Sequence, residues 1–122
     1  MSNKLDLRES LKLPILEATT PMEEFQNQTL RPILKLQNEI YLNLFASYAT
    51  RQNADYHSLT SSKKRTFIEL SLQKDSVLKN TCIGITIGMF TTQELETYLL
   101  DSKSYNKRII TMLIERIKNQ AK

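Results

Sequence analysis

Apolar side chains recur every third or fourth position along most of the chain beyond residue 20, which is the spacing of one face of an α-helix. The pattern is strongest between residues 30 and 53, where the polar side chains fall mostly on the other faces. Its apolar positions are Leu30, Ile33, Leu34, Ile40, Tyr41, Leu44, Phe45 and Tyr48. This spacing predicts a helix that ends near Asn53.

The first helix is predicted to begin at Thr20. A threonine N-cap, a proline at the next position and a glutamate three residues after the threonine form a capping box. Pro32 lies inside the pattern that follows. It either kinks one long helix or separates a short helix from a second helix capped by Thr29.

Three further helix starts are predicted at Thr60, Asp75 and Thr91, whose side chains are suited to capping. Thr91 also forms a second capping box with Glu94. After a short turn at residues 101–104, a last helix is expected with a continuous apolar face. The residues on that face are Ile109, Ile110, Leu113, Ile114 and Ile117.

The segment CIGITIGMF, residues 82–90, is ambiguous. Its isoleucines alternate with smaller residues, which favours a strand. A strand needs a partner for its backbone groups, and no other run in the chain offers one. We therefore predict a helix here.

These patterns predict an all-α fold, a compact bundle of five or six helices formed by residues 20–122 as one domain. Residues 1–19 are leucine-rich and interrupted by Pro14, and they are expected to form an irregular arm that lies across the bundle or onto a second chain. The length of 122 residues allows one hydrophobic core. Only 2 Gly and 3 Pro are present, too few for the many tight turns of a sandwich or barrel.

The residue inventory gives little support for catalysis. One His and one Cys cannot make a disulfide within the chain or a multi-histidine metal cage, so no catalytic residue, metal ligand or cofactor site is predicted. Cys82 lies among apolar residues and is expected to be a core thiol. His57 is expected to be an ordinary loop histidine. A lone cysteine, with no membrane span and no secretory signal, predicts a cytoplasmic protein.

Positive charge is concentrated in the second half of the chain. Residues 62–122 carry eleven Lys and Arg against six Asp and Glu, and residues 102–122 carry six against one. Such a segment favours an acidic or nucleic-acid partner. Alternatively, the cations complement the dipole at the C-terminal end of a helix.

Residues 91–118 have the outline of a helix-turn-helix, with a capped helix, a short turn and a basic helix. Glu96 and Leu100 depart from it, because small residues are usual at those positions, and an apolar residue is expected near Asn106. In a DNA-binding module, the groups facing phosphates and base edges would be Lys103, Ser104, Asn106, Lys107 and Arg108.

Two other groups of residues are candidates for sites. Gly84 and Gly88 form a G-x-x-x-G spacing that marks a close crossing of two helices, inside the bundle or between two copies of the chain. The stripe Tyr41, Phe45 and Tyr48 is either core or the lining of a small-molecule pocket. Because a buried tyrosine hydroxyl needs a partner, both tyrosines are expected to reach the rim of the core.

Three stretches, FQNQTLRPILKLQNE, GITIGMFTTQELETY and NKRIITMLIERI, are spaced across roughly residues 25–117. Together they resemble a family of short all-helical bacterial proteins without an assigned activity. The resemblance implies a compact helical bundle and transfers no catalytic residue.

We therefore expect a non-enzymatic helical bundle that acts through its surface, as a homodimer or by binding a protein partner. A DNA-binding module and a small-ligand carrier are the alternatives. The position of the last helix distinguishes the first two. A helix that projects with its cations on one open face favours DNA binding, and a helix packed lengthwise in the bundle favours protein interaction.

Overall fold

The computed structural model describes residues 20–121, and every regular element within them is helical. The elements are α2 (Pro21–Phe25), the π-helical turn η1 (Gln26–Leu30), α3 (Arg31–Leu36), α4 (Asn38–Gln52), the 3-10 turn η2 (Tyr56–Ser58), α5 (Ser61–Lys74), α6 (Ser76–Ile87), α7 (Thr92–Leu99) and α8 (Ser102–Gln120). The predicted all-α bundle is confirmed. The predicted arm, residues 1–19, lies outside the described residues.

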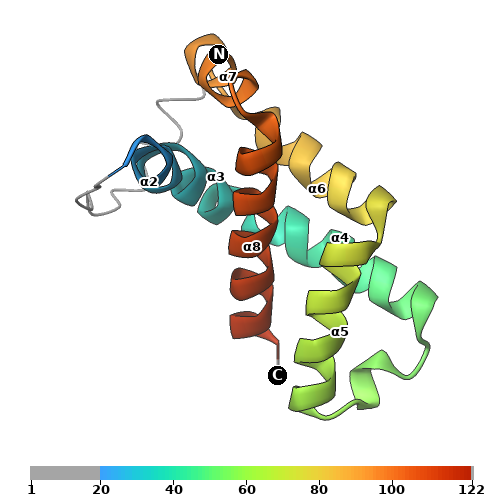
Figure 1. The fold of residues 1–122 in the computed structure, drawn as a ribbon. Helices are drawn as coiled ribbons and strands as arrows, with labels where there is room; N and C mark the ends of the chain where they lie inside the picture. Colours follow the sequence, from blue (N-terminus) through green and yellow to red (C-terminus); the bar gives the residue numbers. More distant parts are fainter. Residues whose placement is uncertain (1–19, 122) are drawn as a thin grey trace.

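Helix α8 is the centre of the packing. It runs alongside α5 in the opposite direction, and α6 packs against both (Figure 1). The α2–η1–α3 segment lies on the other side of α8, and α4 continues from it behind α8 to pack on α6 (Figure 1). Helix α7 sits at the end where α8 begins. All five predicted inward residues of α8 are buried, which confirms its apolar face.

Two aromatic clusters close the ends of the core. Phe25 of α2 contacts Phe90 and Tyr105, with ring centroids 5.5 and 4.7 Å apart, and joins α2 to α8. At the other end, Phe45 and Phe67 pack with Tyr56 and so join α4, η2 and α5. These contacts tie elements that are distant in sequence into one core.

The structure confirms the predicted caps at Thr20, Thr60, Asp75 and Thr91. Thr60 Oγ1 accepts a hydrogen bond from the Lys63 N–H at 3.2 Å, and an Asp75 carboxylate oxygen accepts from the Leu78 N–H at 2.9 Å. The Thr91–Glu94 capping box is reciprocal. The predicted turn at residues 101–104 is shorter, because Asp101 is itself the N-cap and α8 starts at Ser102.

The helix predicted from residue 30 to residue 53 is divided at a different place from the one expected. The chain remains helical through Pro32 and breaks at Gln37, where α4 begins afresh. The wide π-helical turn, in which the Arg31 N–H reaches the Gln26 carbonyl, precedes the proline. It accommodates a residue that lacks an N–H and whose ring crowds the preceding turn. Thr29 is therefore not a cap. It is buried, and its hydroxyl donates to Glu94 Oε2 at 3.0 Å.

The ambiguous segment at residues 82–90 is helical through Ile87, as predicted. The expectation that Tyr41 reaches the rim of the core is wrong. Its side chain is 1% exposed, and its hydroxyl is 2.7 Å from Thr86 Oγ1, deep between α4 and α6. The partner that the sequence did not reveal is a buried threonine on another helix. Tyr48 is half-buried, in keeping with a position at the rim.

Candidate functional site

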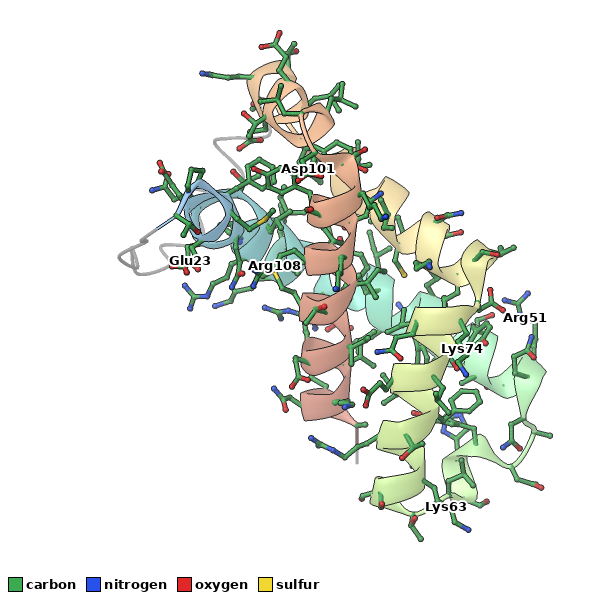
Figure 2. The ribbon with its side chains drawn as sticks, in the orientation of Figure 1. Glu23, Arg51, Lys63, Lys74, Asp101 and Arg108 are labelled. Atoms are coloured by element: carbon green, nitrogen blue, oxygen red, sulfur yellow. The ribbon has the colours of Figure 1, made fainter. Side chains whose placement is uncertain are left out.

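Helix α8 has one buried face and two flanks that carry its polar side chains. Lys103, Asn106 and Lys107 follow three- and four-residue spacing and lie on the flank toward α6. Arg108 and Arg116 lie on the flank toward η1 and α3. Figure 2 shows Arg108 on the α2–α3 side of α8. The predicted nucleic-acid contacts are therefore divided between two surfaces.

We call the first surface the lysine groove. It is a hollow of about 430 Å³ between α6 and α8, and its lysines are Lys79, Lys103 and Lys107. Among the described residues that line it there is no carboxylate. Ile83 and Ile110 form its floor and are almost fully buried. The groove thus combines three cations with an apolar base.

Asn106 also lines the lysine groove, at the position where the helix-turn-helix outline calls for an apolar residue. Its amide oxygen accepts a hydrogen bond from the hydroxyl of Tyr98, which is itself buried in the core. The asparagine therefore satisfies a tyrosine hydroxyl next to the core and fixes the contact of α7 with α8. This use of its oxygen accounts for a polar residue at a half-buried position.

Two of the lysines of α8 lie near its N-terminal end. Lys103 is in the first turn, where the helix dipole disfavours a cation, and Lys107 is in the second turn, beyond the main reach of the dipole. Complementing the dipole is thus no explanation for these two residues, although it fits Lys118 in the last turn. Lys118 additionally forms an ion pair with Glu69 of α5 at 2.7 Å.

We call the second surface the arginine hollow. It has a volume of about 570 Å³ and is lined by Arg31, Arg108 and Arg116, together with Gln26 and the carboxylate of Glu115. Three cations and one anion thus face one space. Residues of α8 line both surfaces, and the other lining residues come mainly from α3, η1 and α6.

Asn38 of α4 fixes the position of the Arg116 side chain. The arginine Nη1 donates to Asn38 Oδ1 at 3.2 Å, and Gln120 Nε2 donates to the same oxygen at 2.9 Å. Burial, followed by the nearby charge of Arg31, lowers the pKa of the Arg116 guanidinium below its ordinary value.

Sequence reasoning found only part of each surface. It identified Lys103, Asn106 and Lys107 because they share one helix. It missed Lys79, Arg31 and Gln26, since each lies on a different element and no local spacing links them to α8.

The glycine pair makes no close helix crossing within the described chain. A Cβ placed on Gly84 would have no atom within 4 Å, and one on Gly88 would meet backbone oxygens of its own helix at 3.4 and 3.5 Å. Both residues are exposed. A crossing between two copies stays a prediction.

The aromatic stripe is packed rather than open. Tyr41 and Phe45 are buried, and the Phe45 ring contacts Tyr48, Tyr56 and Phe67 at centroid distances of 6.0 to 6.1 Å. Tyr48 borders a surface depression of about 350 Å³ beside α6. A small-molecule pocket at this stripe stays a prediction.

The remaining candidates for chemistry, Cys82 and His57, lie on different elements, α6 and η2. Cys82 is 2% exposed, and burial raises the pKa of its thiol to about 11, which keeps it protonated. His57 is exposed and packs against the Tyr56 ring. Between residues 20 and 121 there is no group of three or more His, Cys, Asp or Glu side chains that could hold a metal ion. None of the helices in this range has the length and apolar character that a membrane span requires.

Comparisons with models of protein families, with curated proteins and with solved structures found no match. The resemblance to a helical bacterial family therefore stays a prediction.

Proposed function

We propose that this protein is a non-enzymatic binding module that takes an acidic segment of a partner protein into the lysine groove. The observation that carries this proposal is the convergence of Lys79, Lys103 and Lys107, from two helices, on one hollow without a lining carboxylate among the described residues. Complementary charge steers such a partner and fixes its register. The proposal includes a cytoplasmic location, because a lone buried thiol is typical of a reducing compartment.

The placement of the lysines supports an anionic partner. Lys103 lies in the first turn of α8, at the positive end of the helix dipole, where a cation is disfavoured unless an anion lies nearby. The N-cap carboxylate of Asp101 supplies one such charge, and an acidic side chain of a partner between Lys103 and Lys107 would interact favourably with both lysines. The apolar floor formed by Ile83 and Ile110 suits the stems of such side chains.

Duplex DNA fits this surface less well. A recognition helix enters the major groove with several base-facing side chains on one protruding face. Helix α8 instead packs lengthwise against α5 and α6, and Arg108 lies on a different flank of α8 from Lys107. The residues that would have to read one groove of DNA therefore face two directions.

The test uses the full chain and two labelled polyanions, poly-L-glutamate and a short DNA duplex. The groove variant carries Lys103→Gln and Lys107→Gln. The control variant carries Lys35→Gln and Lys63→Gln, which remove the same charge from exposed positions outside the groove. Fluorescence anisotropy at several salt concentrations gives the affinities.

We expect the groove variant to bind poly-L-glutamate roughly tenfold more weakly, since each exposed ion pair contributes up to about 1 kcal/mol. The control should change little. Equal losses in both variants would mean that net charge alone drives binding and would refute the proposal. Tighter, groove-dependent binding of the duplex would favour the DNA-binding alternative.

We also propose self-association through the exposed side of α6. Gly84 is open to solvent with no atom near its Cβ position, and Val77, two turns earlier, is 78% exposed. Sedimentation velocity of the full chain tests this, with Gly84→Leu as the variant that would obstruct a close approach. A strict monomer at high micromolar concentration would refute it.

A further inference from the structure

Two adjacent leucines are exposed where α7 meets α8, and we call them the leucine corner. Leu99 is 63% exposed and Leu100 is 86% exposed, the highest exposure of any large apolar side chain between residues 20 and 121. Single exposed apolar residues are ordinary on protein surfaces. Two in succession at the end of a helix present a contact area that a partner can cover.

The leucine corner adjoins the lysine groove. The hydroxyl of Tyr98, which directly precedes the leucines, donates to Asn106 in the lining of the groove. Lys103 follows Leu100 by three positions, so their Cα atoms are at most about 11 Å apart. Lys107 lies about 6 Å farther along α8. One extended segment of about six residues can therefore contact the leucine corner and both lysines of α8.

The two ends of this combined surface differ in charge. At the groove, Lys79, Lys103 and Lys107 face a hollow without a carboxylate among the described residues that line it. At the corner, the leucines lie in sequence between the exposed residues Glu96 and Asp101. Asp101 is the N-cap of α8 and lies where α7 joins that helix (Figure 2). Acidic side chains of a partner are thus attracted to the groove and repelled from the corner.

We propose that the partner segment has two parts, acidic residues over the lysine groove and an adjoining apolar residue that covers Leu99 and Leu100. This inference rests on the proposed function and adds an apolar requirement to the chemistry of the partner. The acidic part steers the segment and fixes its register. Burial of apolar surface at the corner contributes affinity that salt does not screen. A segment that is acidic throughout would leave both leucines in water.

Three fluorescent peptides test the proposal against the full chain at constant ionic strength. One is hexaglutamate, and the other two carry a pair of leucines either before or after the glutamates, because a segment can run along the groove in either direction. Fluorescence anisotropy gives the affinities. We expect one leucine-bearing peptide to bind roughly tenfold more tightly than hexaglutamate, since it covers apolar surface at the corner. Equal binding of all three peptides would overturn the proposal.

The corner variant carries Leu99→Gln and Leu100→Gln. It should reduce the affinity for the tighter leucine-bearing peptide to that for hexaglutamate and leave hexaglutamate binding unchanged. The matched control carries Leu70→Gln and Val77→Gln, which remove two exposed apolar side chains outside the groove lining. It should change neither affinity. Equal losses in the corner and control variants would overturn the proposal, and thermal melts check that both variants remain folded.

The groove variant, Lys103→Gln with Lys107→Gln, separates this inference from the proposed function. It should weaken binding of hexaglutamate and of both leucine-bearing peptides. If hexaglutamate binding depends on the two lysines but the leucines of the peptides add no affinity, the proposed function stands and the two-part segment is refuted. If no peptide depends on the lysines, the proposed function fails and this inference fails with it.

Discussion

The buried hydrogen bond between Tyr41 and Thr86 is the most direct test of the core. The Thr86 hydroxyl donates its single proton to the Cys82 carbonyl at 2.9 Å. Its oxygen must therefore accept from the Tyr41 hydroxyl, which lies 2.7 Å away. Thr86→Val keeps the shape of the side chain but leaves the tyrosine hydroxyl without this acceptor.

The two single substitutions should differ in size. Thr86→Val leaves a fully buried donor unpaired and should lower the free energy of unfolding by about 1–3 kcal/mol. Tyr41→Phe removes that donor, while Thr86 keeps its bond to Cys82, so a loss of about 1 kcal/mol is expected. In the Tyr41→Phe background there is no tyrosine hydroxyl to leave unpaired. Thr86→Val should therefore lower the free energy of unfolding by about 1–2 kcal/mol less in this background than in the wild type.

Urea denaturation at neutral pH, followed by circular dichroism, measures all four proteins of this cycle. The denaturant slope should stay constant, so that the shift of the midpoint reports stability alone. Additive losses within about 0.5 kcal/mol would show that the two hydroxyls are not coupled. That result would refute the assignment of tyrosine as donor and threonine as acceptor.

Three further outcomes follow from particular contacts. Burial raises the pKa of Tyr41 to about 12 and that of Cys82 to about 11, so the folded state keeps protons that the unfolded chain releases. These two groups should therefore leave the free energy of unfolding unchanged below about pH 9 and lower it as the pH rises toward 12, by about 3 kcal/mol for each group. Tyr41→Phe should remove the tyrosine part of this loss, which urea titrations at alkaline pH measure. Gly84→Ala should raise the free energy of unfolding by about 0.5–1 kcal/mol, because Gly84 lies in the middle of α6 and a Cβ added there meets no other atom. A decrease would contradict this open geometry. Thr91→Ala should lower the free energy of unfolding by about 1 kcal/mol, whereas the exposed neighbour Thr92→Ala should have little effect.

Features set by neighbouring residues could be predicted from the sequence. The Thr60, Asp75 and Thr91 caps depend on backbone groups only three residues away, so the relevant chemistry is visible in a short window. The helical assignment of residues 82–90 needed a wider argument, that a strand would lack a partner. Both kinds of inference are confirmed by the structure.

Features set by distant contacts could not be predicted. Thr29 resembles a cap in sequence, yet its hydroxyl bonds Glu94, which is 65 residues away. The sequence predicts Tyr41 at the rim, because its partner Thr86 lies 45 residues away on another helix. The same limit applies to the two surfaces beside α8, since Lys79 and Arg31 join them only through tertiary packing.

The exposed lysines of the lysine groove predict a strong salt dependence. Lys103 and Lys107 are exposed, so their attraction to an acidic segment is screened within about 10 Å at 0.1 M salt. Raising the salt concentration should therefore weaken poly-L-glutamate binding more in the wild type than in the variant that carries Lys103→Gln and Lys107→Gln. Equal salt dependence of the two proteins would indicate a diffuse positive field instead of a built groove.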